Sequence, residues 1–205
     1  RSQIRALLRA CSGNELNLMF PMVSEVDEVI RARELVDKEI RFLTRHNYTI
    51  PSSINIGVML EVPALIWHIP ALAPCVDFIS VGSNDLLQFL FASDRASPRL
   101  TGRFDGLSPV FLKILRQVVV ECQNHDVPLS LCGEMAGVPV EAMALIAIGF
   151  RSISMSASSI GPVKEMVLSL DASALEAEIL PQLDQPVKSL RPVIEAFARS
   201  NNIPL

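Results

Sequence analysis

Five short apolar runs recur along the chain, separated by longer segments with helical periodicity. The runs are apolar at nearly every position rather than at every second one, which is typical of strands in a parallel sheet covered on both faces. Strict alternation of such strands with helices indicates an α/β fold. The predicted strands are residues 16–20, 54–60, 78–81, 129–131 and 153–155.

The segments between the runs predict the helices. Residues 24–46 carry apolar side chains at helical spacing, and Ser24 with Asp27 resembles a capping box at their start. Residues 63–72 predict a short helix, with Pro63 tolerated in its first turn. Further helices are expected from Ser108 and Pro109 onward, from Pro139 to a closing Gly149, and twice in the tail after residue 171.

Two architectures fit this alternation, a doubly wound sheet and a (β/α) barrel. No Gly-rich GxGxxG turn follows any run, and polar residues stand at several strand ends, so the barrel is favoured. A complete eight-stranded barrel needs about 250 residues. The chain is therefore predicted to be a partial (β/α)8 TIM-type barrel, comprising about the last five βα units with C-terminal helices. Residues 1–205 would form one domain, truncated at its N-terminal side, and its open strand edges are expected to self-associate.

Composition excludes several classes of protein. The 205 residues carry a formal net charge of −4 with positive charges scattered, which argues against a nucleic-acid or anionic-membrane surface. The apolar stretches are far shorter than the roughly 20 residues that cross a bilayer. The cysteines lack a CxxC pair or zinc-site spacing, so free thiols in a reducing, cytoplasmic compartment are expected. For Cys11, Cys75 and Cys122 we expect buried structural thiols.

Polar side chains follow the predicted strands, at the end where a barrel keeps its chemistry. Glu61 follows one strand, and Ser83, Asn84 and Asp85 follow the next. Carboxylates from two neighbouring strands suit a hard cation such as Mg²⁺, which takes one or two carboxylates and completes its shell with water and substrate oxygens. The alternative for each carboxylate is a helix N-cap or a solvated loop position, and spacing alone does not decide between them.

Two further side chains are candidates for chemistry. Arg95, ten residues after Asp85, is placed either to hold a phosphate or carboxylate bidentately or to pair with Asp94 at the surface. Cys132 ends a strand beside Gly133, where backbone can approach a ligand closely. A thiol there could act as a nucleophile or as a proton donor.

Five stretches carry a resemblance to a known family. They are MFPMVSEVDEV, GVMLEVPAL, FISVGSNDLLQFLFASDR, LSLCGEMAG and SISMSASSIGPVK. Together they resemble the C-terminal phosphoenolpyruvate-binding domain of enzyme I of the bacterial phosphotransferase system, over roughly residues 1–170. The residues of the last two stretches are more similar to the nitrogen-related paralogue than to the sugar-system form.

The resemblance implies roles for the candidate residues. Glu61 and Asp85 would bind Mg²⁺, which grips phosphoenolpyruvate, while Asn84 and Arg95 would contact its phosphate. Cys132 would protonate C3 of the enolate of pyruvate. The family passes the phosphoryl group to a histidine on another domain and then to a histidine phosphocarrier protein, and it pairs as a homodimer through this domain.

The chain also departs from the family's pattern. His46, His68 and His125 lack the motif of the phosphorylated histidine, so the acceptor is expected elsewhere and this stretch alone is expected to be inactive. Two alternatives remain. One is the barrel of a pyruvate phosphate dikinase or phosphoenolpyruvate synthase, which shares the Asn-Asp-Leu and Cys-Gly-Glu motifs. The other is a non-catalytic dimerisation module.

Overall fold

A computed structural model describes residues 1–94 and 103–205. Within them, five parallel strands form one sheet in the order β1-β2-β3-β4-β5. The strands are β1 (Glu15–Phe20), β2 (Ser53–Leu60), β3 (Phe78–Gly82), β4 (Leu129–Cys132) and β5 (Ile153–Ser154). All five predicted strands are present, in the predicted order along the chain. The partial barrel of five βα units is therefore confirmed, with β1 and β5 at the two ends of an open sheet.

Helices follow every strand. The α-helices are α1 (Ser2–Ala10), α2 (Val26–Arg45), α3 (Ile69–Leu72), α4 (Ser83–Leu90), α5 (Pro109–Asn124), α6 (Pro139–Ala147), α7 (Ala157–Ser169), α8 (Ala172–Ile179) and α9 (Arg191–Ser200). Short 3-10 turns are η1 (Pro63–His68), η2 (Ala73–Cys75), η3 (Glu134–Gly137) and η4 (Leu180–Gln182). The short helix predicted at 63–72 is divided between η1 and α3. Prolines at the starts of η1, α3 and η2 explain the division, because proline cannot donate the backbone hydrogen bond that continues a helix.

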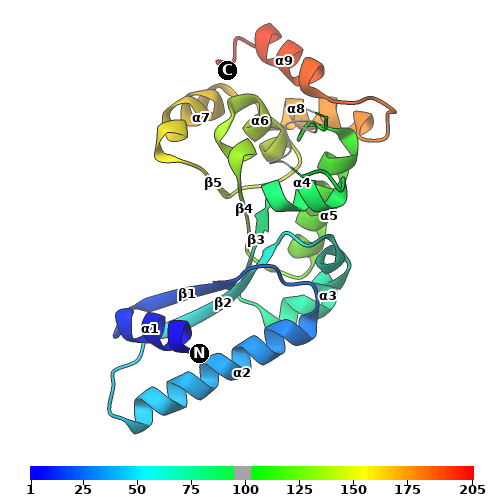
Figure 1. Ribbon diagram of the computed structural model, residues 1–205. Coiled ribbons are helices and arrows are strands. Elements are labelled where there is room, and N and C mark those ends of the chain that lie inside the picture. The colour runs from blue at the N-terminus through cyan, green and yellow to red at the C-terminus, as the bar shows by residue number, and fades with distance from the viewer. Residues whose placement is uncertain (95–102) are drawn as a thin grey trace.

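The helices α1 and α2 cover one end of the sheet (Figure 1). Ile4 and Leu8 of α1 and Val36 and Leu43 of α2 form a small core with Leu16, Leu18 and Ile56 of the first two strands. At the other end of the molecule, α6 to α9 gather around β4 and β5, and the C-terminus lies beside α9.

The prediction that both faces of every strand are covered is wrong for β1. Its burial alternates, with Leu16 and Leu18 buried and Glu15, Asn17 and Met19 exposed. On the exposed face, Asn55 of β2 donates hydrogen bonds to the side chains of Glu15 and Asn17 at 2.9 and 2.8 Å. β3 is different, since four of its five residues are buried. Coverage therefore increases from the edge of the sheet toward its centre.

The start of α2 is shifted by one residue from the expected capping box. Glu25 is the N-cap, and Glu28 supplies the reciprocal bond, in place of Ser24 and Asp27. Ser24 still takes part, because its backbone N–H and its hydroxyl both donate to Glu28 Oε2. These hydrogen bonds lower the pKa of the Glu28 carboxyl. By contrast, Ser108 caps α5 and Gly149 follows α6 in a left-handed conformation, both as predicted.

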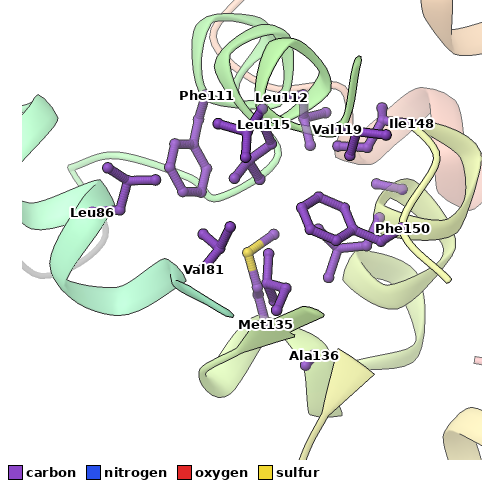
Figure 2. Packing of buried hydrophobic residues seen from close by; sticks show 14 of the residues in the cluster. Val81, Leu86, Phe111, Leu112, Leu115, Val119, Met135, Ala136, Ile148 and Phe150 are labelled. Carbon is purple, nitrogen blue, oxygen red and sulfur yellow. The ribbon is translucent and has the colours of Figure 1, made fainter. Parts of the chain in front are cut away.

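The main core packs α5 and the segment after α6 against β3 (Figure 2). Phe111 and Leu115 of α5 point toward Val81 of β3, and Phe150 enters from the segment between α6 and β5. Each of these four side chains is at most 1% exposed. This packing holds β3 against α5 and the segment that leads into β5.

The C-terminal tail is fastened to the segment that leads into α5. Arg191 at the start of α9 donates to both carboxylate oxygens of Asp105 at 3.0 and 2.8 Å, and also to Glu141 of α6. Next to this cluster, the backbone N–H of Leu190 donates to the carbonyl of Leu107 at 2.8 Å. The tail is therefore an integral layer of the structure.

The four cysteines are free thiols, but only Cys122 is buried. The expectation of buried thiols at Cys11 and Cys75 is therefore wrong, since both are partly exposed. Burial, with a smaller contribution from Glu121, raises the pKa of Cys122 to about 12, so this thiol stays protonated. No helix in the described parts of the chain combines the length and apolar character needed to span a membrane.

Candidate functional site

The C-terminal ends of β2, β3, β4 and β5 lie side by side at one rim of the sheet. Leu60 pairs with Val81, Gly82 with Cys132, and Cys132 with Ser154. The residues that directly follow these strands are therefore neighbours, as the sequence predicted. A rim of this kind is where barrel enzymes place their catalytic groups.

Glu61 is held rigidly at this rim. Glu61 is only 2% exposed, and its Oε1 accepts a hydrogen bond of 2.8 Å from the backbone N–H of Met22, in the loop after β1. Met22 itself adopts a left-handed backbone conformation, with φ of 55°. The alternatives of a solvated loop residue or a helix cap therefore do not apply to Glu61.

Gly82 makes the space that the Glu61 carboxylate occupies. A Cβ atom at position 82 would lie 2.7 Å from Glu61 Oε2, which is closer than real side chains approach. Only glycine allows the carboxylate to lie against β3 in this way. Oε1 accepts from Met22, and Oε2 is the oxygen that lies against Gly82, at the end of β3.

Asp85 lies in the first turn of α4, which begins directly after β3. Among residues 1–94 and 103–205, no three His, Cys, Asp or Glu side chains form a group able to hold a metal ion. The pair predicted from the sequence, Glu61 and Asp85, therefore stays a prediction. Two carboxylates with water and substrate oxygens form a common Mg²⁺ shell, so the donor chemistry of this pair fits that ion.

Asn84 is locked to the next strand end. Its Oδ1 accepts a hydrogen bond of 3.2 Å from the backbone N–H of Glu134. With the carbonyl oxygen so engaged, the amide NH₂ is the donor group that Asn84 can present to an anion. Asn84 also lines a pocket of about 510 Å³ at the rim, with Gly133, Glu134, Gly137, Val138, Ser154, Met155, Ser156 and Ser159.

Gly133 has a packing role that the sequence did not indicate. It has a φ of +130°, and a Cβ there would lie 2.0 Å from Ser83 Oγ and 3.0 Å from Asn84 Oδ1. Its lack of a side chain therefore lets β4 close tightly on the start of α4, in addition to exposing backbone to the pocket.

Cys132, the last residue of β4, is held by two serines of the β3 end. Ser83 Oγ donates to the Cys132 carbonyl at 2.9 Å, and Ser80 Oγ lies 3.9 Å from Sγ as a donor. The thiol lies 3.5 Å from the carbonyl oxygen of Val81, to which it donates. Cys132 is partly exposed, in contrast to the buried Cys122. It is therefore both accessible and oriented.

Arg95 lies outside the described residues, so its predicted phosphate contact stays a prediction. The residues that sequence reasoning overlooked are Ser80 and the backbone of Met22. Ser80 interrupts an otherwise apolar strand, and a buried polar residue at such a position is a signal that a partner must exist. The Met22 contact has no sequence signal, because any residue supplies a backbone N–H.

Comparison with known proteins identifies the family of this chain. Residues 1–172 match the family described as PEP-utilising enzyme, PEP-binding domain, where PEP is phosphoenolpyruvate. This chain belongs to that family. The match covers the whole sheet and α7 and ends at Ala172, the first residue of α8.

Several curated relatives are similar to this chain over most of its length. A protein of Escherichia coli (strain K12) named phosphoenolpyruvate-dependent phosphotransferase system is 43% identical over 183 residues, which are 88% of this chain and 24% of that protein. A phosphoenolpyruvate-protein phosphotransferase of Staphylococcus carnosus is 35% identical over 176 residues, 86% of this chain and 31% of that protein. One of Mycoplasma pneumoniae is 32% identical over 206 residues, 99% of this chain and 35% of that protein. The chain thus spans about a quarter to a third of these relatives.

A solved structure shares the fold. A citrate lyase from Burkholderia xenovorans LB400 superposes with a TM-score of 0.56 at 14% identity, covering 100% of this chain and 70% of that one. At this identity the likeness supports the α/β architecture alone.

Proposed function

We propose that this chain is the PEP-binding domain of a phosphoenolpyruvate-protein phosphotransferase. The observation that carries the proposal is the rim at which neighbouring strand ends place the buried Glu61, the locked Asn84 and the partly exposed Cys132. The names of the relatives support the same reading. In the longer protein, the phosphoryl group would pass from PEP to a histidine on another domain and then to a histidine phosphocarrier protein.

Each rim residue has a role in this proposal. Glu61 and Asp85 would hold Mg²⁺, which neutralises charge on the phosphate and carboxylate of PEP when it is bound. Asn84 would donate its amide to the phosphate, and Arg95 would add a guanidinium. Phosphoryl transfer depends mainly on positioning and charge stabilisation, and a bound cation, an amide and a guanidinium provide both.

Cys132 would complete the reaction. When the bond between phosphorus and the enol oxygen breaks, the enolate of pyruvate remains. The Cys132 S–H bond then breaks as a C–H bond forms at C3, the enolate becomes a ketone, and the thiolate keeps the electron pair. Solvent would return the proton to sulfur afterwards. A positioned acid of this kind contributes roughly 10²–10⁴-fold to rate.

Three finer assignments belong to the same proposal. We place the protein in the cytoplasm, in keeping with its four free thiols. We expect a homodimer, and we favour the nitrogen-related branch on the wording of the LCGEMAG and MSASSIGPVK stretches.

The test uses a longer version of the protein that carries the histidine domain. Cys132→Ala should lower pyruvate release from PEP by roughly 10²–10⁴-fold while Mg²⁺-dependent binding of PEP persists. Cys75→Ala, a partly exposed thiol away from the rim, is the control. Full pyruvate release by Cys132→Ala would remove the assigned role, and a requirement for a nucleotide would point to a dikinase instead.

A further inference from the structure

Buried polar side chains are few in this protein, and most have an evident use. In the described parts of the chain they are Glu39, Glu61, Ser80, Ser83 and Ser108. Glu39 pairs with Arg1 and Arg5, Glu61 belongs to the rim, and Ser108 caps α5. The remaining two, Ser80 and Ser83, both donate to Cys132.

Ser83 and Ser80 act on different parts of Cys132. Ser83 binds the main-chain carbonyl at 2.9 Å, which fixes the end of β4. Ser80 reaches the sulfur itself, at 3.9 Å, from the adjacent strand. Ser80 is 7% exposed, so its hydroxyl has little access to water and depends on partners within the protein.

The contact with sulfur has a chemical consequence. A thiol is a weak hydrogen-bond acceptor, whereas a thiolate is a strong one, because a charged acceptor roughly doubles the strength of a hydrogen bond. A hydroxyl aimed at Sγ therefore stabilises the sulfur after its proton has left more than before. The backbone carbonyl of Val81, which accepts from the thiol at 3.5 Å, favours the protonated form instead.

We infer that Ser80 is a positioning residue that holds Cys132 Sγ and stabilises the thiolate left when Cys132 gives up its proton. The inference rests on the proposed role of Cys132 as proton donor, but the contact itself does not. Together, Ser80 and Val81 hold the sulfur between a donor and an acceptor on the same strand, in an orientation that both protonation states can share.

The test measures the thiol directly and needs no substrate. The rate at which iodoacetamide alkylates Cys132 is followed by mass spectrometry of the peptide, over a series of pH values, in this chain and its variants. Only the thiolate reacts, so the pH profile reports how well the charged sulfur is stabilised. Cys11 and Cys75, both partly exposed, serve as references for intact folding in the same sample.

Ser80→Ala should slow alkylation of Cys132 roughly tenfold near neutral pH, as expected for the loss of a hydrogen bond to a charged group. Rates at Cys11 and Cys75 should not change. Ser130→Ala is the matched control, because Ser130 pairs in register with Ser80 on β4 and precedes Cys132 by two residues. The carboxylates at the neighbouring element ends, Glu61, Asp85 and Glu134, are the same in every variant.

An unchanged alkylation rate at Cys132 in Ser80→Ala, or an equal slowing in Ser130→Ala, would overturn the inference. Faster alkylation of Cys11 and Cys75 would show that the fold of Ser80→Ala is loosened. In that case Ser80→Thr, which keeps the hydroxyl, tests the inference. Alkylation of Cys132 as in the unmodified chain supports the inference, and alkylation as in Ser80→Ala contradicts it. If Cys132→Ala leaves pyruvate release intact in the longer protein, the proposed proton donor is wrong even when the alkylation result holds.

Discussion

At the scale of single residues, glycine and backbone contacts decide the geometry of the rim. Glu61 can lie against β3 because position 82 has no side chain, and it stays there because Met22 donates to its Oε1. The carboxylate is thus oriented before any ligand arrives. Preorganised groups of this kind bind without first losing freedom.

Gly82→Ala should weaken binding of Mg²⁺ by tenfold or more, since the new methyl group would force Glu61 away. The Cβ would meet Glu61 Oε2 at 2.7 Å and Met59 Sδ at 3.1 Å. Titration calorimetry with Mg²⁺ measures the change. Gly106→Ala is the control, because a Cβ there meets its neighbours at an ordinary 3.8 Å or more. An unchanged affinity in Gly82→Ala would show that Glu61 is not a ligand.

At the scale of elements, two partly exposed arginines at the start of the chain pair with one buried carboxylate of α2. Glu39 accepts from Arg1 Nε at 2.6 Å and from Arg5 Nε at 2.7 Å, and the Arg5 guanidinium also lies 3.8 Å from the centre of the Phe42 ring. The hydrogen bond from Arg1, supported by Arg5, outweighs burial and lowers the pKa of the Glu39 carboxyl. Helix α1 is therefore fastened by charge as well as by its apolar face.

This pair makes stability depend on pH. A carboxyl with a lowered pKa in the folded state adds stability above its ordinary value, and that stability is lost as the pH falls through the folded-state value. Glu39→Gln should therefore unfold at lower urea than the unmodified chain at pH 7, and the two midpoints should approach each other near pH 3. Glu34→Gln, exposed on the same helix, should match the unmodified chain throughout. A gap that stays constant with pH would contradict the pairing.

The cluster of Arg191 with Asp105 and Glu141 fastens α9 to the rest of the structure. Burial raises the pKa of the Asp105 carboxyl, but hydrogen bonds from Arg191, Leu107 and Ser189 outweigh it and lower the pKa overall. Asp105 also accepts from Ser189 Oγ at 2.8 Å. The segment that leads into α5 is thus fixed by residues near the C-terminus.

Arg191→Ala should lower the free energy of unfolding by about 2 kcal/mol, because it leaves two partly buried carboxylates without their partner. The loss is smaller than for a fully buried pair, since the side chains of Arg191 and Asp105 are 31% and 22% exposed. Urea denaturation at neutral pH is the measurement. Arg199→Ala on the same helix removes a pair at 3.9 Å with 69% exposure and should cost less than about 0.5 kcal/mol. Equal effects of the two variants would contradict the clamp.

At the scale of the whole molecule, the sheet is open at both ends. β5 pairs with β4 on one side, and beside it an apolar groove of about 800 Å³ is lined by Ile153, Ile160, Val163, Val167 and Leu168 among others. Leu168 is 79% exposed and Ile160 is 53% exposed. Apolar surface next to an unpaired strand edge favours association.

We therefore expect the chain to self-associate in solution, and Leu168→Lys to weaken that association by adding a positive charge to a groove that Arg151 and Lys164 also line. Sedimentation velocity at several concentrations is the measurement. Val110→Lys, at an exposed apolar position of α5, is the control. A strictly monomeric chain would contradict the expected self-association, and equal weakening by both variants would locate the association elsewhere.

The order of elements followed from the sequence alone. Apolar runs and helical spacing gave all five strands, and Ser108, Pro139 and Gly149 marked helix ends correctly, because each of these signals depends on neighbours within one turn of chain. Grouping of Glu61, Asn84, Asp85 and Cys132 at one rim also followed, since parallel strands end at the same edge of a sheet.

The tertiary structure alone decided the contacts that join distant segments. The bond from Met22 to Glu61, the fit of Gly133 against Ser83 and the contact of Ser80 with Cys132 link residues 39 or more positions apart in sequence. The exposed face of β1 depends on what covers that strand. The pattern of apolar and polar residues along the chain reflects the preferences of neighbouring residues, and it contains no information on the distance between strands. That distance is set by the packing of the whole core, which is why the candidate residues could be read from the chain while their orientation could not.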